Sequence, residues 1–215
     1  MNDNPADEPR ISSRGPYARS AETRSRIVAA AWAVFSEVGY TKASVSEIAA
    51  RAEISGAQLF YYFSSKEDLL NIVLEERDSV AADLRTIEEA PVQDIPEALL
   101  MLAARNTDIP GNVRIHTILA VESIAEGHPA HQHFQERYRQ LRESFLAAFG
   151  SMATAGYLAP DISAEYAAQS TLALWDGLHT QWLVEPRAAD VAASLRQHLC
   201  SLVDARCSRL LGLQR

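Results

Sequence analysis

The stretch that decides the fold is SVSEIAARAEISGAQLFYYF, residues 44–63. Ser44 and Glu47 have the spacing of a capping box, in which a serine begins a helix and a glutamate follows three residues later. Ser55 is suited to cap a second helix, because a serine before the first helical residue accepts a hydrogen bond from the backbone. The stretch therefore predicts two short helices in succession, the second over 56–62.

The connection between these helices predicts a helix-turn-helix. It contains a tight turn at Glu53, and small side chains at Ala49 and Ala52 allow the helices to approach closely. Two helices joined by a short turn form this motif, and its second helix enters the major groove of DNA. The alternative is a helical hairpin that binds no ligand, with its tyrosines exposed only as part of an amphipathic surface.

The outward face of the second helix suits recognition of DNA. Gln58 can form two hydrogen bonds with adenine, and Ala57 can contact a thymine methyl group. The absence of a side chain at Gly56 permits close approach, while the hydroxyl groups of Tyr61 and Tyr62 can bond phosphate. Other side chains near helix starts can reach the DNA backbone as well. The candidate DNA-binding residues are Arg24, Ser44, Gly56, Ala57, Gln58, Tyr61, Tyr62 and Lys66.

The charge of the whole chain hides a basic segment. The 215 residues include 20 Lys and Arg against 28 Asp and Glu, and the net charge of −8 alone argues against a nucleic-acid partner. Residues 10–66, however, carry eight basic and four acidic side chains, a net +4, and both lysines of the chain. Residues 67–215 carry 12 arginines and 21 acidic side chains. This asymmetry marks the helix-turn-helix segment as the one that faces DNA.

The remainder of the chain predicts helices too, so the expected fold class is all-α. Apolar residues recur at the helical period, and the sequence lacks sustained strand alternation and hairpin turn signals. Gly39 is suited to end the first helix. About nine helices are predicted, near 21–38, 45–52, 56–62, 66–87, 95–107, 112–125, 130–154, 163–184 and 188–211.

Residues 23–70 resemble the DNA-binding domain of TetR-family transcriptional regulators. The resemblance rests on four runs in order, A-x-x-x-F-x-x-x-G-Y, S-x-x-E-I-A-x-x-A, S-x-x-x-L-F-Y-Y-F and S-K-E-x-L-L. It implies that the first three helices bind DNA and that the fourth connects them to a ligand-binding domain. It also implies that the last two helices pair with a second subunit in a four-helix bundle. The implied backbone contacts are Ser44, Tyr62 and Lys66, and the implied base contacts are Gly56, Ala57, Gln58 and Tyr61.

Three residues depart from the pattern of this family. Glu53 stands where the family usually has the turn glycine, so a residue with a Cβ atom must adopt the turn conformation. Phe60 replaces a tyrosine that many members have, which removes a hydroxyl group directed at phosphate. Gly56 stands where many members have a basic or polar residue. These departures leave the fold assignment intact and the operator sequence open.

The resemblance implies that a small molecule binds the larger domain and changes the spacing of the DNA-reading helices in a homodimer. Those helices must reach successive major grooves, roughly 34–36 Å apart or a multiple of that distance. A ligand that prefers a conformer with another spacing weakens DNA binding. Such a pocket is mainly apolar with a few polar groups, although core packing is the ordinary role of aromatic side chains. The candidate lining residues are Met101, Arg105, His116, Leu119, Tyr138, Phe145, Phe149, Trp175 and His179.

The last two predicted helices carry long apolar faces that suit either the core or a subunit interface. We expect a twofold interface there, which would match a palindromic operator. The candidate interface residues are Leu178, Trp182, Leu195, Leu199 and Leu202. The expected domains are a disordered tail over 1–20, a DNA-binding head over 21–66, and an effector-binding and dimerisation body over 67–215.

Other chemistry is weakly indicated. His128, His131 and His133 surround a proline at a helix start with no cysteine nearby, so a solvated loop is favoured over a metal site. No nucleophile motif or phosphate-binding loop suggests an enzyme, and neither a metal nor a cofactor is expected. The sequence has no apolar run that could span a membrane and no secretory signal. Its two cysteines suit a reduced, cytoplasmic setting.

The sequence thus predicts a homodimeric transcriptional repressor that binds a double-stranded DNA operator and is released by a small-molecule effector. The alternative is a helical small-molecule-binding protein that does not bind DNA, for which Glu53 at the turn is the only support. Sequence-specific, salt-sensitive binding to DNA distinguishes the first from the second.

Overall fold

The computed structural model describes residues 16–77 and 80–207. Within those residues every regular element is a helix, which confirms the all-α fold class, and an isolated antiparallel bridge joins Leu158 to Val203. The α-helices described are α1 Pro16–Lys42, α2 Val45–Arg51, α3 Gly56–Tyr62, α4 Lys66–Arg77, α5 Val80–Glu88, α6 Ile95–Asp108, α7 Pro110–Glu122, α8 His131–Thr154, α9 Ala164–Val184 and α10 Val191–Leu202, and a short 3-10 helix, η1 Val92–Asp94, precedes α6.

Two boundaries near the start of the chain differ from those expected. α1 begins at Pro16, so its first turn occupies part of the segment predicted as a disordered tail. The rest of that prediction concerns residues 1–15, which lie outside the described residues. The single long helix expected from Lys66 is described as α4 and α5, on either side of residues 78–79. The described helices therefore number ten rather than nine.

The last helix is shorter than expected. α10 ends at Leu202 and Val203 is extended, so the predicted continuation of this helix is wrong. Backbone hydrogen bonds of 2.9 Å, from Ala159 N to Leu202 O and from Asp204 N to Tyr157 O, hold the chain against the segment that follows α8. These bonds redirect the chain where apolar spacing alone favours more helix.

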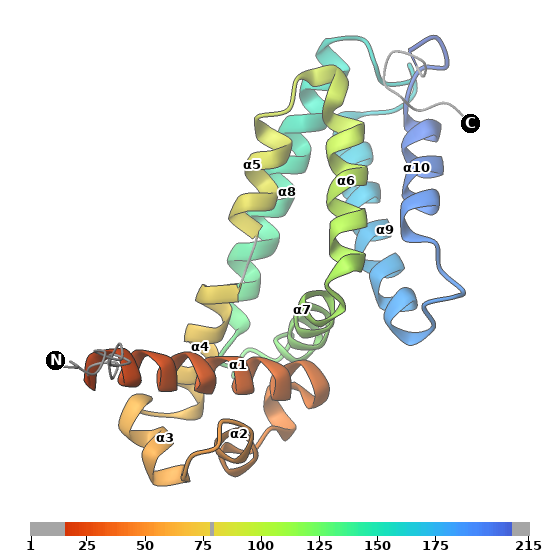
Figure 1. Cartoon of the computed structure of the whole chain (residues 1–215). Coiled ribbons are helices and arrows are strands. Elements are labelled where there is room, and N and C mark those ends of the chain that lie inside the picture. The colour runs from red at the N-terminus through yellow and green to blue at the C-terminus, as the bar shows by residue number, and fades with distance from the viewer. Residues whose placement is uncertain (1–15, 78–79, 208–215) are drawn as a thin grey trace, which may run out of the picture.

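The helices form a small head below a tall body (Figure 1). α1 lies across the head, with α2 and α3 beneath it, while α5, α6, α8, α9 and α10 stand above. α8 and α9 pack against each other and run in opposite directions. α7 lies at the junction and packs against α1, so it is placed to connect the two parts.

The head and the body each have an apolar core. The core of the head also includes side chains from α7 and α8. The buried Phe35 of α1 and Leu59 of α3 belong to the core of the head. The same core includes Ile115 and Leu119 of α7 and Phe134 of α8. A second core fills the body between η1 and the helices α5, α6, α8, α9 and α10. The head is therefore completed by helices that also belong to the body.

The ends of α1 and α7 are joined through a sharp bend at Gly39. Its φ of 79° and ψ of 173° interrupt α1, in agreement with the expected end of the first helix. The carboxylate of Glu122 accepts hydrogen bonds from Tyr40 N at 2.8 Å and Thr41 N at 3.4 Å. We call this arrangement the Glu122 clasp. The positive φ favours glycine at position 39, and a Cβ atom there would lie 2.3 Å from Glu122 Oε1, so the carboxylate would have to move out of the clasp.

The turn between α2 and α3 confirms the conformation expected of Glu53. Its φ of 57° lies in the left-handed region, where a Cβ atom is unfavourable. We expect Glu53→Gly to raise the free energy of unfolding by about 1 kcal/mol, because glycine relieves that cost despite a more flexible unfolded chain. Chemical denaturation measures the change.

Glu53→Ala is the matched control for this experiment. It removes the 3.6 Å ion pair with Arg26 but keeps the Cβ atom, so it should leave stability nearly unchanged. Equal stability of the glycine and alanine variants would contradict a conformational cost at this turn.

Candidate DNA-binding surface and ligand cavity

The two short helices of the head begin as predicted. Ser44 Oγ accepts a hydrogen bond from Glu47 N at 3.1 Å, and Ser55 Oγ accepts one from Gln58 N at 3.1 Å. The carboxylate of Glu47 accepts a hydrogen bond from Arg51 at 3.1 Å instead of returning to the start of the helix, so one half of the capping box forms. These serine caps set where α3 begins and which of its residues face outward.

α3 presents its predicted DNA-binding residues on the open side of the head. Its inner face is buried in the core of the head, whereas Ala57 and Gln58 are exposed. Tyr61 is 82% exposed, and Tyr62 is half-buried with its ring edge-on to that of Tyr61 at 5.3 Å. Gly56 begins the helix and is half-buried. The first turn of α3 is thus available for base edges.

Phe60 is an exposed residue of this surface that was not predicted as a DNA contact. Its side chain is 52% exposed. The helical period could have found it, because Phe60 follows the exposed Ala57 by three residues and lies on the same face. A phenyl ring can contact a thymine methyl group, so an apolar contact can replace the lost hydroxyl group.

Two predicted phosphate-binding side chains have partners within the head. Lys66 Nζ donates hydrogen bonds to Tyr40 O at 2.8 Å and Ala43 O at 3.0 Å, and burial lowers the pKa of Lys66. The same ammonium group lies 4.1 Å from the centre of the Tyr40 ring. Arg24 donates to Glu76 at 2.6 Å. Both side chains hold α1 and α4 in place, and their contacts with phosphate stay predictions.

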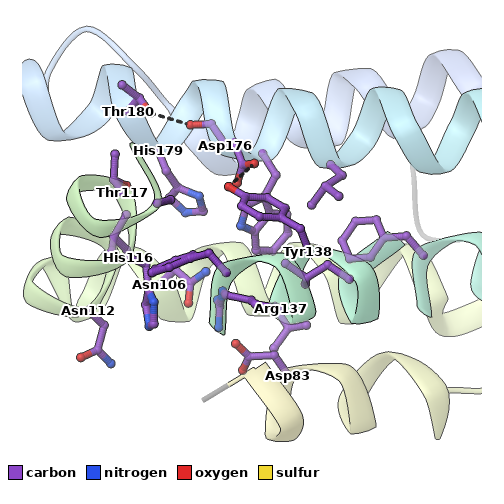
Figure 2. Close-up of a pocket in the computed structure, with 18 of the residues that line it drawn as sticks. Asp83, Asn106, Asn112, His116, Thr117, Arg137, Tyr138, Asp176, His179 and Thr180 are labelled. Atoms are coloured by element: carbon purple, nitrogen blue, oxygen red, sulfur yellow. Dashed lines mark hydrogen bonds between the residues drawn. The ribbon is translucent and has the colours of Figure 1, made fainter. Parts of the chain in front are cut away.

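A cavity of about 220 Å³ lies in the body and is lined by residues of α5, α6, α7, α8 and α9 (Figure 2). Five of the nine residues predicted from the sequence line it, namely His116, Tyr138, Phe145, Trp175 and His179. Further polar lining residues were not predicted, because isolated polar positions on amphipathic helices give no distinct signal. They are Asp83, Asn106, Asn112, Thr117, Arg137, Asp176 and Thr180.

The other four predicted lining residues lie elsewhere. Met101 is 54% exposed on α6, and Phe149 is fully buried in the core of the body. Leu119 faces the core of the head instead. Arg105 forms an ion pair with Asp83, whose side chain lines the cavity. These positions share the helical spacing of the true lining residues but project from other faces of their helices.

The polar wall of the cavity contains a hydrogen-bonded pair from α8 and α9. The hydroxyl group of Tyr138 donates to Asp176 Oδ2 at 3.0 Å. Loss of solvent is the main cause that raises the pKa of Tyr138 to about 12, with the Asp176 charge adding to it. The pKa of Asp176 is also raised by loss of solvent, against the opposing effects of Tyr138 and Arg137. Tyr138 therefore stays a neutral donor at ordinary pH.

His179 lies beside this pair and is only 4% exposed. Burial lowers its pKa to about 4, so the imidazole is neutral near pH 7. One ring nitrogen bonds to the backbone of Trp175, and the Trp175 ring lies edge-on at 5.4 Å. The other nitrogen, Nε2, is buried without a hydrogen-bond partner among the described residues. A buried, unpaired acceptor in a cavity wall is a group that a ligand can satisfy.

Of the three clustered histidines, His128 lies between α7 and α8, and His131 and His133 lie in the first turn of α8. His128 Nδ1 accepts a hydrogen bond from Ala130 N at 3.2 Å, and His131 Nδ1 lies 2.7 Å from Ser123 O. His133 packs edge-on against Phe134 at 5.2 Å. The favoured expectation of a solvated loop is therefore wrong for His128, whose side chain is 7% exposed. Across residues 16–77 and 80–207, no group of three or more potential ligands is close enough to hold a metal ion.

Four of the residues predicted at a dimer interface are buried inside the protomer. Leu178, Leu195, Leu199 and Leu202 belong to the core of the body, which corrects their assignment to the interface. Trp182 is partly buried and packs against that same core. Long apolar faces on α9 and α10 thus reflect the contact between these two helices.

Two family models match this chain in separate regions. Residues 27–73 match the model of bacterial regulatory proteins of the tetR family, which covers the head. Residues 112–208 match the model of the BetI-type transcriptional repressor, C-terminal, which begins at α7. In the parts of the chain that the structure describes, we find no helix with the length and apolar character needed to cross a membrane.

Individual proteins resemble the chain over most of its length. It is 30% identical over 193 residues to the HTH-type transcriptional repressor BepR of Brucella suis biovar 1 (strain 1330), an alignment that covers 83% of this chain and 88% of BepR. Its structure resembles NalD, the secondary repressor of the MexAB-OprM multidrug efflux pump in Pseudomonas aeruginosa, with a TM-score of 0.70, 23% identity and coverage of 87% and 99%. It also resembles SmeT of Stenotrophomonas maltophilia in complex with triclosan, with a TM-score of 0.69, 19% identity and coverage of 86% and 94%. The chain therefore belongs to the TetR family of bacterial transcriptional regulators.

Proposed function

We propose that this chain is a homodimeric repressor that binds a palindromic DNA operator and releases it when a small molecule occupies the cavity. It acts in the cytoplasm, where bacterial operator DNA lies, and we assign it no catalytic role. The observation that carries the proposal is the position of α7, which lines the cavity and also completes the core of the head. Occupancy of the cavity can therefore act on the DNA-binding helices.

The residues of α7 divide between the two parts of the molecule. His116 and Thr117 line the cavity, whereas Ile115 and Leu119 lie in the core of the head. The last residue of this helix, Glu122, forms the clasp to the bend of α1. A ligand that displaces α7 must therefore displace α1 or break these contacts, which gives the ligand a different affinity for the two conformers.

Close packing between α1 and α7 supports the same coupling. A Cβ atom at Gly111 would lie 2.2 Å from the Trp32 ring, so these two helices approach as closely as glycine permits. The resemblance to the family favours the helix that begins at Lys66 as the connection between ligand and DNA. That helix, α4, is buried against α1 within the head, so α7 provides the more direct route to the cavity.

The similar proteins support both halves of the proposal. BepR is a transcriptional repressor, and it shares 30% identity with this chain. SmeT has the same fold and forms a complex with triclosan.

We propose that the dimer forms through the outer side of α9 and α10, where Tyr166 and Val184 of α9 are exposed.

We expect Gln58→Ala to weaken binding to the operator roughly 5- to 150-fold, because one good contact with a base edge contributes about 1–3 kcal/mol of discrimination. Affinity for unrelated DNA should stay the same, since that affinity depends on phosphate contacts. Fluorescence anisotropy with DNA fragments from upstream of the gene, at several salt concentrations, measures both quantities.

Gln93→Ala is the matched control for this prediction. Gln93 is an exposed glutamine in η1 at the far end of the body, so its removal should leave operator binding unchanged. An equal loss of affinity for specific and unrelated DNA in Gln58→Ala would contradict a base contact. An absence of DNA binding by the unsubstituted protein at every salt concentration would favour the alternative, a small-molecule-binding protein without DNA binding.

A further inference from the structure

A buried histidine in the cavity wall indicates the chemistry of the effector, an inference that rests on the proposed function. His179 is 4% exposed, and its Nε2 atom has no hydrogen-bond partner among the described residues. Its other ring nitrogen bonds to the backbone of Trp175, one helical turn earlier on α9. That bond requires the proton on the nitrogen facing Trp175, so Nε2 of the neutral ring carries a lone pair.

Several polar groups of the same wall bond to other residues of the protein. Tyr138 donates to Asp176 at 3.0 Å, and the hydroxyl group of Thr180 donates to the carbonyl oxygen of Asp176 at 2.9 Å (Figure 2). Asp83 is paired with Arg105. The lone pair of His179 is thus a buried acceptor beside groups that are otherwise engaged, and an unpaired buried acceptor is costly.

The cavity has a polar end and an apolar end. α8 and α9 run antiparallel, so Arg137 and Tyr138 near the start of α8 lie level with His179 near the end of α9. Figure 2 shows His179 at the same end as His116 and Thr117 of α7. The lining residues farther from α7 are apolar and include Leu141, Phe145, Leu172 and Trp175. A ligand that fits both ends is amphipathic.

We infer that the effector is an uncharged amphipathic molecule whose hydroxyl or N–H group donates a hydrogen bond to His179 Nε2, with an apolar body between Phe145, Leu172 and Trp175. The donor end of the ligand lies against α7, the helix that completes the core of the head. Asp83 is paired with Arg105, and Arg137 lies in the same wall as Asp176, so the charges at this end oppose one another and an uncharged head group is favoured.

Three probes of nearly the same size test the inference. They are para-butylphenol, its methyl ether para-butylanisole, and para-butylbenzoate, which is anionic. Isothermal titration calorimetry of the full-length protein without DNA gives the dissociation constant of each. We expect the phenol to bind about tenfold more tightly than the ether, because the ether leaves Nε2 unpaired, and the benzoate to bind most weakly.

Substitution of His179 shows whether this atom sets the preference. His179→Leu should bring the affinities for the phenol and the ether to within about twofold of each other, because the acceptor is gone. His179→Gln should restore part of the preference, because its side-chain oxygen can accept a hydrogen bond. His198→Gln is the control, since His198 bonds to Thr171 at 3.0 Å outside the cavity and should keep the full preference.

Several outcomes would overturn the inference. They are equal affinity of the unsubstituted protein for phenol and ether, a preference that persists in His179→Leu, or tightest binding of the benzoate. Failure of all three probes to bind at millimolar concentration would overturn it as well. Thermal unfolding of each variant shows that it is folded at the temperature of the calorimetry, so that the dissociation constants refer to folded protein.

Operator binding of the same protein separates this inference from the proposed function. If the protein binds its operator but does not distinguish phenol from ether, the inference about the effector fails and the proposed function stands. If it distinguishes them through His179 but does not bind DNA, the proposed function fails and the donor specificity of the cavity stands.

Discussion

Gly39→Ala is expected to lower the free energy of unfolding by about 4 kcal/mol, which is a large share of the stability of a typical domain. The bend has a φ of 79° and a ψ of 173°, a conformation that is almost confined to glycine. The new Cβ atom would also lie 2.3 Å from Glu122 Oε1 and expel the carboxylate from Tyr40 N and Thr41 N. Urea denaturation at a fixed protein concentration measures the loss.

Two further variants test the cause of this loss. Gly127→Ala is the matched control, because a Cβ atom there meets nothing within 4 Å, and it should be nearly neutral. Glu122→Ala should cost much less in the Gly39→Ala background than in the unsubstituted protein, because the hydrogen bonds it removes are already broken. Additive effects of the two substitutions would contradict the Glu122 clasp as the reason glycine is required.

The second large effect is a dependence of stability on pH through His179. Burial lowers its folded-state pKa to about 4 from an ordinary value of 6.5. Above pH 6.5 the ring is neutral in both the folded and the unfolded state. As the pH falls from there towards 4, the unfolded state takes up a proton and the folded state does not, so stability declines.

As the pH falls from about 7 to about 5, protonation of His179 in the unfolded state should lower the free energy of unfolding by about 2 kcal/mol. His179→Leu lacks the titrating group, so its free energy of unfolding should fall by that much less over the same interval. Denaturation curves at closely spaced pH values measure the difference. Thr180→Val, a neighbouring change with no titrating group, should follow the unsubstituted protein, and parallel curves for the unsubstituted protein and His179→Leu would show that His179 is not held neutral.

The features predicted correctly from the sequence are those set by local chemistry. Ser44 and Ser55 cap their helices because a hydroxyl group needs only the backbone three residues on. Glu53 adopts the left-handed conformation just after α2, where local backbone bonds from Glu53 N to Ala50 O and from Ile54 N to Ala49 O close the end of the helix. The exposed first turn of α3 follows from the same helix register.

The features predicted incorrectly depend on which neighbouring helix packs against each face of a helix. His116 and Leu119 are three residues apart on α7, yet His116 lines the cavity and Leu119 lies in the head, because α7 is enclosed on both sides. Leu195 and Leu199 have the spacing of an interface, but α9 of the same protomer covers them. The end of α10 is set by backbone bonds to a distant segment, which apolar periodicity does not encode.

The composition of the head's core also bears on synthesis of the protein. A ribosome releases the N-terminal part of a chain first, and domains commonly fold in that order. Here the core that contains Phe35 and Leu59 also requires Ile115, Leu119 and Phe134, which are made much later. The DNA-reading helices therefore cannot complete their packing until the start of α8 has left the ribosome. The packing of the head and its contact with α7 thus form at the same stage of synthesis.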